Sequence, residues 1–294
     1  PAHRARQRLL HGEAGRDDRD DGGHNAQRGR GPHRPKSSTF VIDSREKAPA
    51  AATPDMFGGE GFAIASLQGV AVGVPGMVRG TELALKRFGR MTFREVLSPA
   101  IDLADRGFAA TKRYALVTCN ARAQNSPEAA AFFCPNGAAV PEGSPVVNKD
   151  LAGTFRLIAR HGADCFYKSM PDKGCDIARG IIEGQKAATK AGSRGGSMTY
   201  ADLEAYRADV RETTKGSYRG WKLEAMSPPS SGGLTLLQML GMLERFPIGD
   251  ESQGFGFGSV KTANVMASAM RIAFADRAVW MGDADFVAVP ERGL

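Results

Sequence analysis

Histidine is almost missing from the body of this chain, and its absence limits the chemistry that the sequence can support. Four of the five histidines lie within the first 36 residues. The fifth, His161, stands before Gly162 at the end of a predicted helix, where helix capping is its expected role. Because histidine is the commonest general base, we expect neither a Ser-His-Asp nor a Cys-His catalytic machine. Dinucleotide-binding, zinc-protease and kinase motifs are missing as well.

Cysteine is also scarce, and no cysteine stands in a C-x-x-C pair. The four cysteines form two pairs that are near in sequence, Cys119 with Cys134 and Cys165 with Cys175. With His161 as the only histidine of the body, we expect no metal site. The residues alone leave two states open: two short-loop disulfides in an exported protein, or free buried thiols.

Long apolar runs are absent. No segment approaches the roughly 18 to 20 apolar residues that a membrane-spanning helix needs, and no apolar stretch near the N-terminus resembles a secretion signal. With 42% hydrophobic and 24% charged residues, the 294-residue chain has the composition of a globular protein and the length for a sizeable core. We therefore expect a folded region without a membrane span.

Positive charge gathers at the N-terminus. Residues 1–36 hold nine basic and five acidic side chains, which accounts for +4 of the net charge of +7. This segment has no aromatic residue and no apolar periodicity, so we predict that residues 1–37 are disordered and that residues 38–294 form the folded region. The basic segment carries no motif that reads bases, so we expect no specific nucleic-acid binding.

Helix signals recur along residues 38–294. Thr92 with Glu95 and Thr199 with Asp202 match the capping-box pattern, in which a hydroxyl and a carboxylate each bond a free backbone N–H. Proline, glycine and small polar residues separate these segments and predict loops. Helices are predicted over 75–88, 92–107, 114–125, 151–161, 176–183, 199–206, 232–243 and 259–281, with loops over 135–148 and 186–197, the second of them flexible.

The stretch from 226 to 246 carries the clearest local pattern. A turn over 218–221 and a strand over 222–226 lead into it, and two prolines stiffen the approach. Ser230 and Ser231 then precede two glycines, and leucines follow at helical spacing. We predict that the serines cap the first turn of a packed helix. Gly-rich turns at helix starts also hold anions, which is a second interpretation.

Arg45 follows a predicted strand over 39–43. An arginine just beyond the end of a strand commonly lies at the mouth of a site, where its planar guanidinium grips a carboxylate with two parallel hydrogen bonds. The alternative is a surface arginine that pairs with a nearby aspartate or glutamate. The residues alone leave both interpretations open.

Five blocks of sequence, taken together, carry a family resemblance. With them, the chain from about Thr39 to Leu294 resembles the large-subunit portion of a gamma-glutamyltransferase, also called glutathione hydrolase. The Pro-Ser-Gly block is the most specific, and the arginine block stands at the expected separation from it. The blocks are 43–50 (DSREKAPA), 73–76 (GVPG) with 97–104 (LSPAIDLA), 198–206 (MTYADLEAY) through 218–220 (YRG), 227–233 (SPPSSGG), and 275–277 (ADR) with 281–286 (MGDADF).

The resemblance implies an α/β, helix-rich part of the N-terminal-nucleophile hydrolase fold, a four-layered αββα sandwich. Family members are made as a precursor that cleaves itself, so that a threonine becomes the N-terminus of a small subunit. The free amine of that threonine then serves as base for its own hydroxyl, which explains why no histidine is needed. The hydroxyl attacks the γ-glutamyl amide of glutathione, and the acyl group passes to water or to an amino acid or peptide acceptor, without a cofactor.

One site residue carries over to this chain. Arg45 matches the arginine that grips the α-carboxylate of the substrate, and the resemblance favours this role over a surface ion pair. No catalytic residue is expected here, because the nucleophilic threonine belongs to the small subunit, which we expect beyond Leu294. Ser230 and Ser231 are not the serines that bind the substrate in the family, because those also belong to the small subunit.

The resemblance leaves two other interpretations of function. One is a cephalosporin-type acylase of the same fold, and the other is a truncated remnant without activity. It also implies a periplasmic or secreted protein. Residues 1–37 depart from the family, because they show neither the expected helix of small residues nor a Gly-rich segment. Their Arg/His/Pro/Gly excess is typical of a GC-rich gene translated out of frame, so this segment is predicted to be disordered or aberrant.

Overall fold

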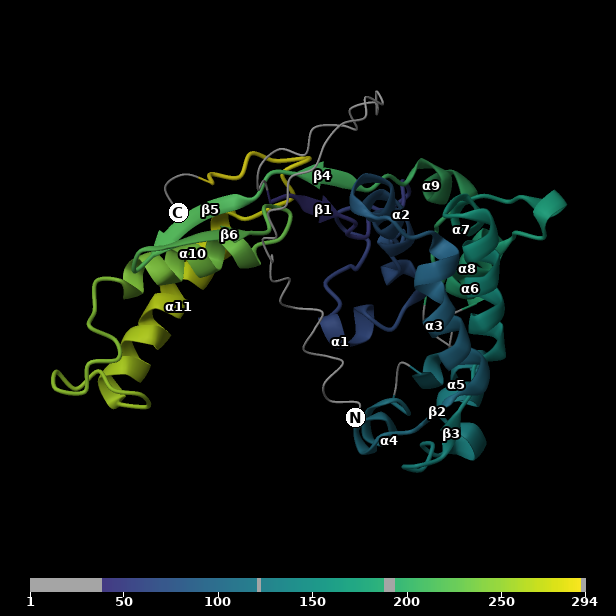
Figure 1. Cartoon of the computed structure of the whole chain (residues 1–294), viewed down its shortest axis with the longest axis horizontal. Helices are drawn as coiled ribbons and strands as arrows, with labels where there is room; N and C mark the ends of the chain where they lie inside the picture. The colour runs from purple at the N-terminus through teal and green to yellow at the C-terminus, as the bar shows by residue number, and fades with distance from the viewer. Residues whose placement is uncertain (1–38, 121–122, 188–193, 292–294) are drawn as a thin grey trace, which may run out of the picture. The chain divides into compact units, whose positions relative to one another are not determined.

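A computed structural model describes residues 39–120, 123–187 and 194–291 (Figure 1). About half of these residues belong to helices, and the strands form three two-stranded antiparallel sheets, β1–β4, β2–β3 and β5–β6. The strands are β1 (Val41–Asp43), β2 (Phe108–Ala109), β3 (Pro145–Val146), β4 (Asp209–Arg211), β5 (Thr214–Tyr218) and β6 (Trp221–Ala225). The predicted N-terminal segment 1–37 lies outside the described residues.

Eleven α-helices are described, and several are short. The longest, α11, lies against α10, while α3 lies against α6 (Figure 1). No helix among the described residues combines the length and apolar character that crossing a membrane requires. The helices are α1 (Phe62–Ala65), α2 (Met77–Phe88), α3 (Phe93–Arg106), α4 (Lys112–Val117), α5 (Pro127–Phe133), α6 (Lys149–His161), α7 (Asp164–Tyr167), α8 (Ile177–Ala187), α9 (Tyr200–Ala205), α10 (Gly232–Leu243) and α11 (Val260–Trp280).

Both predicted capping boxes are confirmed. Thr92 accepts a hydrogen bond from the backbone N–H of Glu95 and returns its own backbone N–H to the carboxylate of that residue, at 2.7 Å. Thr199 and Asp202 exchange the same pair of bonds at the start of α9. The Asp202 carboxylate also accepts the backbone N–H of Ala50 at 2.8 Å. A local helix signal thus anchors the loop that follows Arg45.

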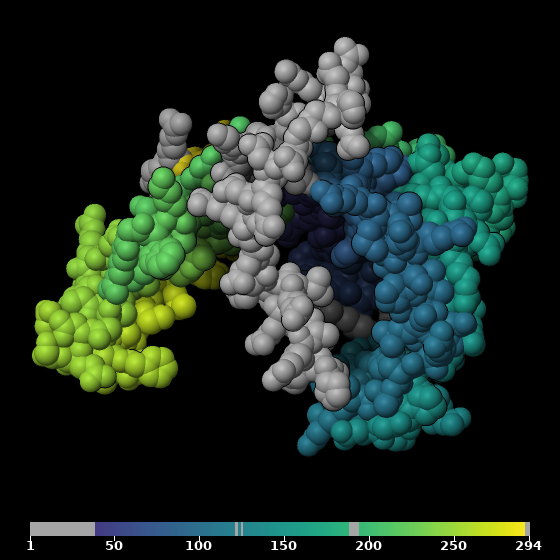
Figure 2. All heavy atoms as spheres, viewed as in Figure 1, coloured from purple at the N-terminus to yellow at the C-terminus, as the bar shows by residue number. Residues whose placement is uncertain are grey.

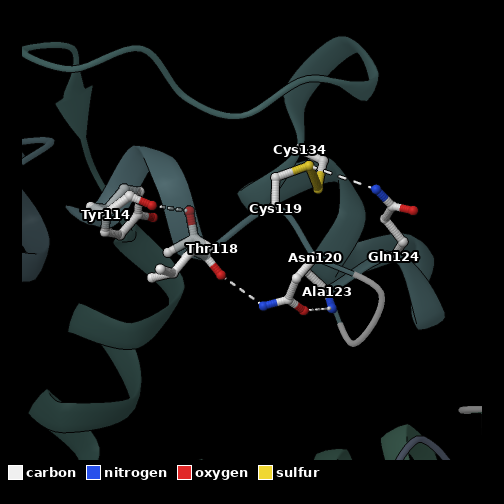
Figure 3. The surroundings of a disulfide bond; sticks show 8 residues. Tyr114, Thr118, Cys119, Asn120, Ala123, Gln124 and Cys134 are labelled. Atoms are coloured by element: carbon white, nitrogen blue, oxygen red, sulfur yellow. Dashed lines mark hydrogen bonds between the residues drawn. A yellow bond between two sulfur atoms is a disulfide. The ribbon is translucent and has the colours of Figure 1, made fainter. Parts of the chain in front are cut away.

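The helix predicted over 114–125 is wrong in its second half. Helix α4 ends at Val117, because the Asn120 side chain takes over backbone groups that a longer helix would use. Its amide donates to the carbonyl of Val117 at 2.7 Å, and its oxygen accepts the N–H of Ala123 at 3.2 Å (Figure 3). The predicted loop over 135–148 holds strand β3, and part of the predicted loop over 186–197 lies outside the described residues.

Both cysteine pairs form disulfides, which answers the question that the sequence left open. Cys119 bonds Cys134, joining the end of α4 to the end of α5 (Figure 3). Cys165 bonds Cys175 across only 10 residues and ties α7 to the segment before α8. Both members of this second pair are fully buried, so the disulfide is part of the hydrophobic core.

The main core joins α7, α8 and α9 to the segment before α2. At its centre, the rings of Tyr167 and Tyr206 stack with their centroids 5.8 Å apart. Tyr167 is fully buried, and only 3% of Tyr206 is exposed. The Tyr167 hydroxyl donates to the carbonyl of Pro75 and the Tyr206 hydroxyl to that of Arg45, both at 2.7 Å. The buried residues of the cluster are Val74, Ala163, Tyr167, Ala178, Ile182, Met198, Leu203 and Tyr206.

Gly76 lies in close contact with Tyr206. A Cβ atom at Gly76 would stand 2.0 Å from the hydroxyl oxygen of Tyr206 and 2.1 Å from the carbonyl oxygen of Ser44. The Tyr206 hydroxyl bonds the carbonyl of Arg45, and Ser44 directly precedes Arg45 in the chain. Neither oxygen can therefore move away without disturbing the Arg45 loop. Gly76, the second glycine of the GVPG block, is therefore required because the backbone here packs so close to Tyr206 and Ser44.

We predict that Gly76→Ala lowers the free energy of unfolding by about 1–3 kcal/mol, because the added methyl group overpacks the Tyr206 contact. Urea denaturation measures the change. Gly153→Ala in α6 is the matched control, since nothing lies within 4 Å of a Cβ atom there and alanine suits a helix better than glycine. A Gly76 variant as stable as the Gly153 variant would contradict the steric argument.

A second prediction concerns the stability of the fold at acidic pH. Arg79 on α2 bonds Asp164 on α7 at 2.7 Å, and this hydrogen bond lowers the pKa of Asp164 below its ordinary value of 3.8. The folded state then binds this proton less tightly than the unfolded state, so the stabilisation is present above the unfolded-state value of about 3.8 and is lost as the pH falls below it, through the lowered pKa of the folded state.

Asp164→Asn should therefore lower the melting temperature at pH 6 and narrow its difference from the wild type towards pH 3. Thermal unfolding followed over this pH range measures the effect. Asp102→Asn, which removes only an exposed pair at 3.5 Å, is the control and should show a smaller gap at every pH. A difference for Asp164→Asn that stays constant with pH would refute the linkage.

Candidate functional site

Three segments that are distant in sequence surround one pocket. Its volume is about 310 Å³, and the lining comes from the turn after β1, the approach to α10 and the end of α11. The structure thus brings the predicted Arg45 together with the SPPSSGG block and with the last of the five blocks. The lining residues are Arg45, Pro228, Pro229, Ser230, Ser231, Arg277, Ala278, Met281 and Gly282.

The charge of this pocket is one-sided. Two guanidinium groups, those of Arg45 and Arg277, line it, and no aspartate or glutamate does. The Arg45 side chain is 52% exposed, and its nearest acid is Glu46, with 3.9 Å between Nε and Oε1. So long and exposed a contact leaves the guanidinium open to a stronger partner. The predicted surface ion pair is present, but only in this weak form.

The backbone of Arg45 is held more firmly than its side chain. Its N–H donates to Oδ1 of Asp43 at 3.0 Å, and its carbonyl accepts the Tyr206 hydroxyl at 2.7 Å. Burial, with Tyr167 and Asp43 nearby, raises the pKa of Tyr206, so the hydroxyl keeps its proton and remains a donor. Both peptide groups of Arg45 are therefore fixed, while the guanidinium remains free to meet a ligand.

The prediction that Ser230 and Ser231 cap α10 is wrong. Ser231 stands at the capping position, but its backbone is already helical, with ψ at −17°, and its side chain makes no capping bond. A capping residue normally has an extended backbone that turns its oxygen towards the helix. The Ser231 hydroxyl instead accepts Nε of Arg277 at 2.9 Å. The serine therefore links the start of α10 to the end of α11.

The glycines of the same block bring this helix close to the hairpin. A Cβ atom at Gly233 would stand 2.3 Å from the carbonyl oxygen of Met226 and 2.9 Å from Cβ of Ala225. The first turn of α10 therefore lies directly against the end of β6. The predicted strand and turn are confirmed, because β6 follows a tight turn in which Arg219 and Gly220 both have positive φ.

Arg277 is the site residue that the sequence did not single out. It appeared only within the ADR block, as an arginine in the last turn of an apolar helix, where a basic residue is ordinary. None of the ion pairs found among the described residues involves Arg277, and Ser231 occupies only its Nε. Its terminal nitrogens are thus available to the pocket. The signal that marks it is the Ser231 bond, which joins residues 46 apart in sequence.

The pocket is suited to bind rather than to react. Guanidinium groups and hydroxyls line it, but neither Ser230 nor Ser231 has a histidine, lysine or carboxylate among the lining residues to activate it. Among the described residues, no group of three histidine, cysteine, aspartate or glutamate side chains could hold a metal ion. The geometry supports capture of a carboxylate.

Comparison with known proteins agrees with the resemblance seen in the sequence. The family model described as Gamma-glutamyltranspeptidase matches residues 33–294. A glutathione hydrolase proenzyme of Bacillus subtilis is 38% identical over 262 residues, which cover 87% of this chain and 42% of that protein. An acylase ACY 1 proenzyme of Pseudomonas sp. strain SE83 is also 38% identical, over 86% of this chain and 45% of that protein.

The crystal structure of Helicobacter pylori gamma-glutamyltranspeptidase superimposes with a TM-score of 0.76 at 36% identity, covering 86% of this chain and 73% of that one. The predicted fold class is thus confirmed as a helix-rich part of the N-terminal-nucleophile hydrolase fold. The chain spans less than half the length of the curated relatives it matches. Because the family model matches all of residues 39–294, this chain belongs to the gamma-glutamyltranspeptidase family.

Proposed function

We propose that this chain is the large-subunit part of a gamma-glutamyltransferase. The enzyme would cleave the γ-glutamyl amide of glutathione and pass the γ-glutamyl group to water or to an amino acid or peptide acceptor. One observation carries the proposal: in a member of this family, the Arg45 guanidinium lines a pocket that holds a second arginine and no acid. Such a pocket favours a substrate with a free carboxylate, which every γ-glutamyl compound carries.

The role of Arg45 in this reaction is binding. Its planar guanidinium is suited to two parallel hydrogen bonds with the α-carboxylate of the glutamyl group. That grip would fix the donor at one end and leave the γ-amide to reach the nucleophile. Because the two peptide groups of Arg45 are already bonded, little backbone freedom is lost when the substrate arrives.

The nucleophile would come from the small subunit of the same precursor. The hydroxyl oxygen of its N-terminal threonine bonds the γ-carbonyl carbon, and the free amine of that threonine takes the hydroxyl proton. The amine returns the proton to the leaving nitrogen as the amide bond breaks. Water or an acceptor amine then attacks the acyl-enzyme and releases the γ-glutamyl product. This division of labour agrees with the lack of an activated serine around the pocket.

The surface of α10 and α11 supports a partner of this kind. Large apolar side chains of α11 are exposed, among them Phe274 at 55% and Val279 at 70%. A cavity of about 760 Å³, lined mainly by apolar residues, lies between the two helices. Figure 2 shows the yellow-green segment that joins them at the surface, and Phe257 in this segment is fully exposed. We propose that the small subunit covers this face, since so much apolar surface is otherwise costly in water.

The two disulfides support a periplasmic or secreted location. Disulfides form and persist in oxidising compartments, and cytosolic thiols are kept reduced. All four cysteines of the chain are bonded, so none is left for redox or metal chemistry. Export is therefore part of the proposed function.

An acylase of the same fold is the second candidate, because the acylase ACY 1 proenzyme matches at the same 38% identity as the glutathione hydrolase. The two candidates differ in what the acyl group carries. A γ-glutamyl donor needs Arg45 for its α-carboxylate, whereas an amide whose acyl group lacks an α-carboxylate does not.

We predict that Arg45→Ala in the intact heterodimer lowers kcat/KM for a γ-glutamyl donor roughly 10- to 150-fold, which corresponds to a lost charged hydrogen bond of about 1.5–3 kcal/mol. Arg45→Lys should recover part of the loss, because it restores the charge without the two-pronged geometry. Steady-state kinetics with a chromogenic γ-glutamyl amide measure both.

Arg106→Ala is the control, since this arginine is 79% exposed on α3 and pairs weakly with Asp102. It should leave kcat/KM unchanged. A loss of less than fivefold for Arg45→Ala would overturn the proposed role of Arg45. Higher activity on an amide without an α-carboxylate than on the γ-glutamyl donor would favour the acylase.

A further inference from the structure

The turn that carries Arg45 is held by a chain of charges that reaches beyond the pocket. Oδ1 of Asp43 accepts the backbone N–H of Arg45 at 3.0 Å, and Oδ2 of the same carboxylate accepts Nε of Arg211 at 2.7 Å. The two terminal nitrogens of Arg211 bond the two carboxylate oxygens of Asp285, each at 2.8 Å. Asp43, Arg211 and Asp285 thus form a continuous relay that ends on the Arg45 backbone.

Strand pairing explains why this relay can form. Strands β1 and β4 lie side by side in Figure 1, with Val41 opposite Arg211 and Asp43 opposite Asp209. Asp43 and Arg211 are therefore diagonal neighbours on one face of the ribbon, a separation that a long side chain spans. Asp285 follows α11 and reaches the other side of the same guanidinium. The relay joins the first block, the strand after α9 and the last block.

Two of the three relay residues are shielded from water, and the third, Asp285, lies at the surface. The side chain of Asp43 is 7% exposed, that of Arg211 is 19% exposed, and that of Asp285 is 37% exposed. Hydrogen bonds from Arg211 lower the pKa of Asp285, and those to Asp285 and Asp43 raise the pKa of Arg211, so Asp285 and Arg211 stay charged around neutral pH. A buried carboxylate that loses its only cation is costly, and Asp43 would then reorient towards water. The bond to the Arg45 N–H would be lost with it.

No member of the relay lines the pocket, so none of them meets the substrate there. Together they hold the backbone conformation of the turn that carries Arg45. The Tyr206 hydroxyl bonds the same turn through the carbonyl of Arg45. We propose that Arg211 and Asp285 are positioning residues, which hold the Arg45 guanidinium where it can bond the substrate carboxylate. This inference rests on the proposed role of Arg45, and it names the relay as the cause of the position of the guanidinium.

The test uses the intact heterodimer and a chromogenic γ-glutamyl donor. Arg211→Met should raise KM at least tenfold and change kcat less than threefold, because the loss falls on carboxylate binding and not on the nucleophile. Asp285→Asn, which keeps the shape of the side chain but removes its charge, should raise KM less than Arg211→Met does. Arg211→Lys should recover only part of the wild-type KM, because one ammonium cannot bond both carboxylates in the same geometry.

A double-mutant cycle separates positioning from general damage. If Arg211 acts through Arg45, Arg211→Met should raise KM by less than twofold when Arg45→Ala is already present. Arg156→Met, which removes the 2.8 Å bond from α6 to Asp105 on α3, is the control for a lost ion pair elsewhere and should leave KM unchanged. If Arg211→Met does not assemble, the same cycle with Asp285→Asn decides the matter.

The outcomes separate this inference from the proposed function. An Arg45→Ala enzyme with unchanged KM and kcat would overturn both. A large effect of Arg45→Ala with no effect of Arg211→Met or Asp285→Asn would overturn the positioning role alone. An equal rise in KM for Arg211→Met with and without Arg45 would show that Arg211 acts independently of Arg45, and would also overturn it.

Discussion

One hydroxyl connects the hydrophobic core of this chain to its binding pocket. The Tyr206 ring is buried against Tyr167, and its oxygen ends on the carbonyl of Arg45. Burial fixes the ring, the ring fixes the oxygen, and the oxygen fixes the turn that presents the guanidinium. The glycine at position 76 is needed because the loop before α2 must pass this oxygen at close range. Packing and binding are therefore parts of one construction.

The sequence predicted what depends on neighbours along the chain. The capping boxes at Thr92 and Thr199 are read from four consecutive residues, and the helices that follow them are where the pattern placed them. The strand before Arg45 and the turn before β6 are equally local. The family blocks predicted the fold class, because their order and separation reflect a shared architecture.

The sequence did not predict what depends on contacts across the chain. Serine is a common capping residue, yet the hydroxyl of Ser231 bonds Arg277, which lies 46 residues away in sequence. The Asn120 side chain ended a helix that periodicity alone would have continued. Whether the two cysteine pairs are disulfides or free thiols was left open because spacing does not report geometry. In each case a tertiary contact or a side-chain hydrogen bond overrode a local preference.

The relay from Asp285 to Arg45 has a consequence for how the chain folds. Its two ion pairs join residues that are 168 and 74 positions apart in sequence. Contacts of such sequence separation form slowly, because a long loop must close before they contribute. We expect the turn that presents Arg45 to take its final form late in folding. The hydrophobic core would then be in place before the binding site, which would be among the last regions of the described chain to become ordered.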